Sequence, residues 1–275
     1  MVVRRVLLDA FGTVFSPREP VFQQYTSVAR SFGLQVEEAR VKDGFKQAFK
    51  NWAKAYPLYG KRSTPPLDPE QWWTGVIDET FRRAGVPAAE FEPVSARLCT
   101  TLVHRFWGQE GYALHDDVHP LLHSLHAFGL PPPVIVSNTD PSVSRILRAL
   151  GTIEGQTDPL DAGIRESEVW TTWELEQEKG GPTFWEEVLV RLRATARERG
   201  EDELEAHDVL VVGDEAVSDY EAPRRVGMQS LLLRRDPVGE HARASYSDDE
   251  RGVAQDHTVS SLLEVVEFVK RANGA

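Results

Sequence analysis

The sequence is short of cysteine, of lysine and of long apolar runs, and each shortage excludes a class of protein. A single cysteine, Cys99, cannot form a disulfide within the chain, so a disulfide-stapled fold is excluded and a reducing compartment is expected. No apolar run approaches the ~20 residues of a membrane span. The first residues are too few for a signal peptide and are expected to form a strand. We therefore expect a protein of the cytoplasm or nucleus that has no membrane partner, with Cys99 as a buried apolar residue.

Positive charge is scarce as well. The formal net charge of −12 argues against a general affinity for nucleic acid. It leaves open a local pocket for a phosphorylated small molecule or another anion. Only seven of the 31 basic residues are lysine, and Lys179 is the only lysine between Lys61 and Lys270. With 41% hydrophobic and 27% charged residues, the chain has the composition of an ordinary globular protein of one large domain, or of a core with a smaller unit.

Four short apolar runs end in polar or turn residues, as the buried strands of a parallel sheet do. These runs are Val6–Leu8, Pro133–Val136, Val209–Val212 and Ser230–Leu233. Helical patterns lie between or after them, at His119–Phe128, Pro182–Arg199 and Val259–Arg271. This alternation predicts an α/β fold with a doubly wound, Rossmann-like parallel sheet.

The segment between the first two predicted strands is far longer than a crossover helix requires, and its signals are helical. Asp68 followed by Pro69 is a typical helix start. We expect an all-helical cap over residues 19–113, inserted into a core formed by residues 1–18 and 114–275. The alternative is a long crossover within one domain. The polar stretch 236–256 is expected to be a mobile loop before the last helix.

Chemically useful side chains follow three of the predicted strands. Asp9, Ser137 and Asp214 each stand at a strand end, and parallel strands bring such ends to one edge of the sheet. Gathered there with Asp219, the aspartates would repel one another unless a cation lay between them. Magnesium prefers such oxygen ligands. Lys179 could neutralise charge that develops on a transferred group.

These residues, in this order, resemble the motifs of the haloacid dehalogenase superfamily. The resembling segments are Leu8–Thr13, Val136–Asn138, Lys179 with Pro182 and Phe184, and Gly213–Asp214 followed by Asp219. The helical insertion resembles the cap of the dehalogenase and phosphoglycolate phosphatase branch. Gln71–Trp73 and Asp219–Met228 are similar to the subgroup named haloacid dehalogenase-like hydrolase domain-containing protein 3.

The resemblance implies roles for the site residues. Asp9 would be the nucleophile of a phosphoryl-ester hydrolase that works through an aspartyl intermediate. Ser137, Asn138 and Lys179 would hold the phosphoryl group. Magnesium would be bound by Asp9, Asp214, Asp219 and the backbone carbonyl of Phe11.

Phe11 departs from the superfamily pattern. Phosphatases of the superfamily carry a second aspartate at this position, which protonates the leaving group, and the loss of such a group costs about 10²–10⁴-fold in rate. Dehalogenases carry an aromatic residue here but lack the acidic pair of the fourth motif. A metal-independent 2-haloacid dehalogenase is therefore a second hypothesis, and a catalytically weak binding or scaffold protein is a third.

Three further features each allow two interpretations. Lys179 precedes Gly180–Gly181 rather than the superfamily's proline-containing run, so a solvated lysine is the alternative to a site residue. A group of histidines at helical spacing could be a metal site, but surface or packing roles are favoured. A lysine every fourth residue is typical of a solvated helix face, and an anion-attracting face is the alternative. The two groups are His115, His119, His123 and His126 with Asp116 and Asp117, and Lys42, Lys46, Lys50 and Lys54.

Overall fold

The computed structural model describes residues 2–155, 162–235, 253 and 255–274. Most of the loop expected over residues 236–256 lies outside this part of the chain. Two compact units are present. The first unit comprises Met1–Ser16, Leu114–Asn138 and Gly151–Ala275, and the second comprises Pro17–Ala113 and Thr139–Leu150.

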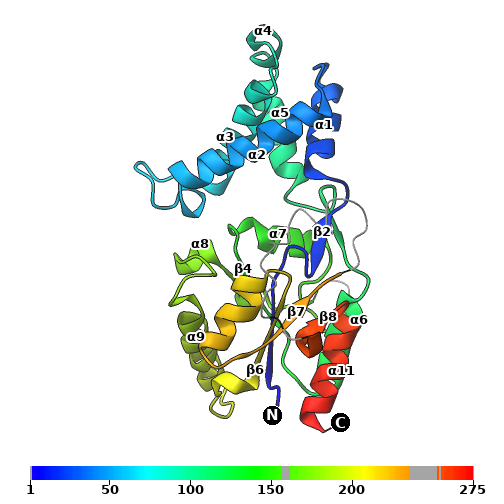
Figure 1. Cartoon of the computed structure of the whole chain (residues 1–275), viewed down its shortest axis with the longest axis vertical. Helices are drawn as coiled ribbons and strands as arrows, with labels where there is room; N and C mark the ends of the chain where they lie inside the picture. Colours follow the sequence, from blue (N-terminus) through cyan, green and yellow to red (C-terminus); the bar gives the residue numbers. More distant parts are fainter. Residues whose placement is uncertain (1, 156–161, 236–252, 254, 275) are drawn as a thin grey trace. The chain divides into compact units, whose positions relative to one another are not determined.

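The first unit is built on a six-stranded sheet in which all neighbouring strands are parallel (Figure 1). In spatial order the strands are β5 (Val169–Thr171), β4 (Val134–Ser137), β1 (Arg5–Leu8), β6 (Val209–Gly213), β7 (Gln229–Leu233) and β8 (Thr258–Val259). The four strands predicted from apolar runs are therefore confirmed. The two edge strands were not predicted, because two or three residues are too few to show a pattern.

The register of the sheet brings the functional ends together. Leu8 of β1 lies opposite Ile135 of β4 on one side and Val212 of β6 on the other. The backbone N–H of Asp9 still donates to the carbonyl of Val212, at 2.9 Å. The C-terminal ends of β4, β1 and β6 therefore lie side by side at one edge of the sheet, as the sequence predicted.

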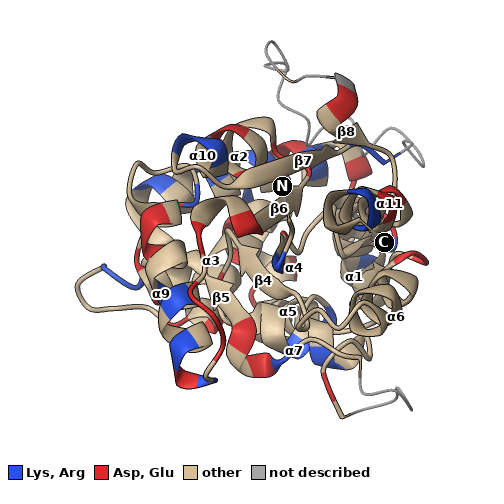
Figure 2. Cartoon of the chain, turned by 90° about the horizontal axis from the view of Figure 1, so that it is seen from below, with Lys and Arg blue, Asp and Glu red and all other residues tan. Residues whose placement is uncertain are grey.

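Helices cover both faces of this sheet. Helix α9 (Phe184–Glu198) lies against one face, and α6 (Val118–Ala127) and α11 (Leu262–Asn273) lie against the other (Figure 1). In α9, apolar residues recur at helical spacing and pack on the sheet in one buried cluster. Its acidic and basic residues are interspersed along the helix (Figure 2). The unit also contains the short helices α8 (Thr172–Leu175) and α10 (Ala222–Arg225) and the π-helical turn η4 (Ala216–Glu221). The doubly wound α/β fold is confirmed.

The second unit is helical. Its helices are α1 (Val21–Ser31), α2 (Glu38–Ala55), α3 (Pro69–Arg83), α4 (Ala88–Phe91), α5 (Ser95–Arg105) and α7 (Ser142–Ala149). Helix α3 begins where predicted, because Asp68 and Gln71 cap it reciprocally. Cys99 is buried in the apolar core of this unit, as expected. No helix of the described residues is both long and apolar enough to cross a membrane.

The limits of the units differ from the expected ones at residues 139–150. That segment was expected in the core, but it clusters with the second unit. The indole N–H of Trp73 donates to Asp140 at 2.8 Å, and Arg145 lies over the Trp107 ring at 4.4 Å. Strands β2 (Phe15–Pro17) and β3 (Tyr112–Leu114), also not predicted, form a two-stranded sheet where the chain passes between the units.

Candidate active site

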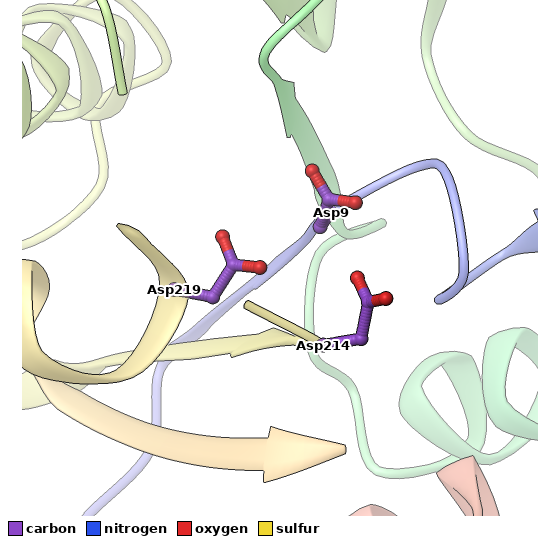
Figure 3. A group of neighbouring side chains, drawn as sticks. All are labelled: Asp9, Asp214 and Asp219. Atoms are coloured by element: carbon purple, nitrogen blue, oxygen red, sulfur yellow. The ribbon is translucent and has the colours of Figure 1, made fainter. Parts of the chain in front are cut away.

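Three carboxylates lie close together at the C-terminal ends of the strands. Asp9 follows β1, Asp214 follows β6, and Asp219 lies in η4 (Figure 3). One carboxylate oxygen of each lies within 4.8 Å of the others. Asp9 and Asp214 are each 8% exposed, and Asp219 is fully buried. Sequence reasoning had gathered these three aspartates at one edge, and the structure places them there.

Two glycines make this approach possible. A Cβ atom at Gly12 would collide with the carboxylate of Asp214, and one at Gly213 would collide with that of Asp219. Gly12 also has φ +74°, a conformation that side chains other than glycine rarely adopt. The turn after β1 and the end of β6 therefore leave room for the carboxylates, because Gly12 and Gly213 have no side chains.

Lys179 lies among the three carboxylates. Its Nζ is 2.6 Å from Oδ1 of Asp9 and 2.5 Å from Oδ1 of Asp219. The side chain is 1% exposed, so the interpretation of Lys179 as a solvated lysine is wrong. The loop that carries it follows α8, which begins with Thr171 and Glu174 capping each other. The altered third motif thus still delivers its ammonium group to the site.

The electrostatics of the site reflect an excess of negative charge. Burial, and after it the charges of Asp9, Asp219 and Glu215, raise the pKa of Asp214 to about 8. Burial also raises the pKa of Asp9 to about 7, although Lys179 opposes the shift. Burial alone would lower the pKa of Lys179, but Asp219 and Asp9 raise it overall. The single positive charge of Lys179 does not balance the negative charge of three buried carboxylates.

The donor set fits a small divalent cation. Fully ionised, the three carboxylates and Lys179 leave two negative charges, which a cation such as Mg²⁺ would neutralise. Oxygen ligands of Mg²⁺ lie at about 2.1 Å, so opposite ligands are about 4.2 Å apart, close to the observed spread. Within the part of the chain that the structure describes, the Asp214 carboxylate accepts no hydrogen bond and Asp9 has one oxygen that accepts none. Asp219 forms an ion pair with Lys179 and accepts a hydrogen bond from the backbone N–H of Glu215.

The other residues predicted for the site are Ser137, Asn138 and Phe11. Ser137 ends β4 and is 1% exposed, and Asn138 follows it and is exposed. The ring of Phe11 packs edge-on against Phe15, with 4.7 Å between centroids. A hydrocarbon ring in this place offers no proton to a leaving group. The roles of Ser137, Asn138 and the Phe11 carbonyl stay predictions.

Two neighbours of the site were not found from the sequence. Trp185 of α9 lies beside Lys179, and Arg234 at the end of β7 donates to the backbone carbonyl of Asp214. A loop with two glycines separates Lys179 from Trp185, so their spacing gave no signal of the first contact. Nothing in the sequence distinguishes Arg234 from the other arginines.

The histidine group does not form a metal site in the described residues, and the exposed lysine stripe fits both of its interpretations. Among the described residues, only the three aspartates form a group suited to a metal, and His115 instead bonds Ser16, with 2.9 Å between Nε2 and Oγ. The four lysines of α2 are exposed.

A doubly wound sheet with an aspartate after its central strand and a helical insertion defines a known class of hydrolase fold. Residues 3–227 match the family model described as haloacid dehalogenase-like hydrolase. The chain belongs to that family. It is 31% identical over 235 residues to haloacid dehalogenase-like hydrolase domain-containing protein 3 of Danio rerio, covering 85% of this chain and 86% of the relative.

Solved structures agree on the fold. A defluorinating L-2-haloacid dehalogenase has a TM-score of 0.64 and 17% identity, covering 98% of this chain and 95% of that chain. A HAD-hydrolase from Bacillus subtilis, solved bound to magnesium, has a TM-score of 0.60 and 13% identity, covering 98% and 99%. At these identities the likeness shows a shared fold alone.

Proposed function

We propose that this hydrolase cleaves a phosphate ester of a small molecule, with Asp9 as the nucleophile and Mg²⁺ as the cofactor. The observation that carries the proposal is the cluster of Asp9, Asp214 and Asp219 around a single ammonium group. Such a cluster is short of positive charge, and both a divalent cation and a cation-bound phosphate are compatible with its oxygen donors.

In the first step, the oxygen of Asp9 that accepts no hydrogen bond attacks phosphorus, and the bond from phosphorus to the ester oxygen breaks. The other oxygen of Asp9 is held by Lys179 at 2.6 Å, which fixes the orientation of the carboxylate. Ser137, Asn138 and Lys179 would hold the phosphoryl oxygens. Bound Mg²⁺ would add stabilisation of the negative charge on those oxygens. In the second step, water cleaves the phosphoaspartate and restores Asp9.

Phe11 sets the expected speed of this reaction. Its ring cannot protonate the departing alkoxide or activate the water of the second step. We therefore expect slow turnover, except with esters whose leaving group needs no proton. Phosphate esters of acidic alcohols or phenols would be cleaved best.

The test is a phosphate-ester panel assayed with Mg²⁺ and with chelator. We expect weak Mg²⁺-dependent hydrolysis by the wild type, none by Asp9→Asn, and a gain of about 10²–10⁴-fold by Phe11→Asp on esters of poor leaving groups. Full activity of Asp9→Asn would contradict the proposed nucleophile. If the wild type and both variants bind the cation but none of the three hydrolyses any ester, a binding or scaffold role is favoured.

Hydrolysis of 2-haloacids is a second candidate, and Phe11 is the observation that favours it. A halide leaves without a proton, so an aromatic residue beside the nucleophile costs nothing in that reaction. A solved dehalogenase shares the fold. Halide release from 2-chloropropionate in the presence of chelator would support this function. The buried Asp214 argues against it, because an acid beside Asp9 disfavours attack on a carboxylate-bearing substrate.

A further inference from the structure

A closed ring of contacts joins Lys179, Asp219 and Trp185. Nζ of Lys179 lies 2.5 Å from Asp219 and 5.9 Å from the centroid of the Trp185 ring. The indole Nε1 of Trp185 donates to the backbone carbonyl of Ser218, the residue before Asp219, at 3.0 Å. One aromatic side chain therefore contacts both the ammonium group and the turn that carries its carboxylate partner.

The backbone around these two residues does not fix their positions alone. Lys179 is followed by Gly180 and Gly181, which restrict the chain little. Asp219 lies in the π-helical turn η4, whose wide winding is irregular. The carbonyl of Ser218 in that turn accepts a side-chain N–H.

Trp185 is itself held firmly. It is 1% exposed, belongs to the apolar core between α9 and the sheet, and packs edge-on against Phe184, with 5.4 Å between centroids. A ring fixed on α9 can serve as a reference point for the loop of Lys179 and the turn of Asp219. Phenylalanine at this place would lose the N–H donor and, being smaller, would also leave a small cavity in the core.

We propose that Trp185 is a positioning residue that holds the Lys179 ammonium group against Asp219 and so keeps the carboxylate cluster in shape for its cation. This inference deepens the proposed function and rests on it only for the identity of the cation. Partners that orient metal ligands typically change metal affinity about 10- to 100-fold when they are removed. We expect Trp185→Phe to weaken Mg²⁺ binding by about 10-fold, and Trp185→Leu by more.

The chain offers a matched control in Trp170. Its indole N–H also donates to a backbone carbonyl, that of Ser167 at 3.1 Å, and its ring is buried in the same core cluster. It lies on β5, two strands away from Asp9 in the sheet. Trp170→Phe therefore removes the same kind of bond from the same core without touching Lys179 or the turn of Asp219.

The decisive measurement is independent of metal and of activity. Acetic anhydride is applied in chelator, and acetylation of Lys179 is compared by mass spectrometry with that of the exposed Lys50. Loss of one ordinary hydrogen bond should raise the relative labelling of Lys179 about 5-fold in Trp185→Phe and leave Trp170→Phe unchanged. Benzothienylalanine at position 185, which keeps the ring shape without the N–H, should behave like Trp185→Phe and guards against misfolding of that variant.

Calorimetric titration with Mg²⁺ then separates the two proposals. If the wild type binds no Mg²⁺, the proposed cofactor is wrong, and the labelling alone decides the role of Trp185. Unchanged labelling of Lys179 after removal of the indole N–H would overturn the positioning role. An equal rise in Trp170→Phe would also overturn it, because the effect would then be a general loosening of the core.

Discussion

Replacement of Gly12 by alanine tests the geometry of the carboxylate cluster without removing a charged group. The backbone at Gly12 has φ +74°, so a side chain costs about 1–2 kcal/mol in unfolding free energy from conformation alone. Its Cβ would also overlap the Asp214 carboxylate. That carboxylate is nearly buried and has to move, which should disturb the group of oxygens that could hold a cation.

Gly200 provides the control for this substitution. Its φ is +68°, but a Cβ there would meet nothing within 4 Å. Gly200→Ala should therefore lose a similar 1–2 kcal/mol and keep the cluster intact. Any difference between the two variants then reports the collision with Asp214.

The assay is urea unfolding in chelator and in Mg²⁺. At a concentration of 100 times its dissociation constant, the cation should stabilise the wild type and Gly200→Ala by about 2.7 kcal/mol, and Gly12→Ala by close to zero. In chelator Gly12→Ala should be less stable than Gly200→Ala by the cost of moving Asp214. An undiminished Mg²⁺ effect in Gly12→Ala would refute the reasoning, because the cation would then not depend on the position of Asp214.

Three further predictions concern charge. Lys179→Met should lower the unfolding free energy by about 3–5 kcal/mol at neutral pH in urea titrations, because it leaves the buried carboxylates of Asp9 and Asp219 without the ammonium group that they pair with. The raised pKa of Asp214, about 8, means that the folded state binds a proton that the unfolded state lacks, so stability in chelator falls as pH rises from about 4 to 8. Asp214→Asn should flatten that fall and abolish the Mg²⁺-dependent rise in melting temperature. Burial and then Arg235 lower the pKa of His115 to about 4, so its stability contribution is lost as pH falls from about 6.5 to 4, and His115→Gln should show less acid destabilisation in that window.

Much of the fold and the centre of the site could be predicted from the sequence. Buried parallel strands are nearly continuous apolar runs, so the strands that carry Asp9, Ser137 and Asp214 were visible as such runs with polar ends. Parallel pairing then requires their ends to share an edge. This local pattern and one topological rule were enough to gather the aspartates.

The position of Lys179 could not be predicted in the same way. It lies in a loop after an altered motif, and its place depends on the packing of Trp185 and on the turn of Asp219, neither of which has a periodic signal. The membership of residues 139–150 was missed for a similar reason. The bond between Trp73 and Asp140 joins residues far apart in the sequence, and no pattern along the chain reports it.

The order of the strands has a consequence for synthesis of the chain. β1 is made first, yet it is a central strand, and its neighbours β4 and β6 begin only at Val134 and Val209. At about 5–20 residues per second, an emerging β1 waits roughly 6–25 s for its first partner. During that time the nascent chain exposes three apolar residues, Val6 to Leu8, with unpaired backbone groups, and such an unpaired strand is prone to aggregation. The helices made in the meantime form from local contacts, so we expect the insertion to gain structure on the ribosome before the sheet edge that carries Asp9, Asp214 and Asp219 has formed.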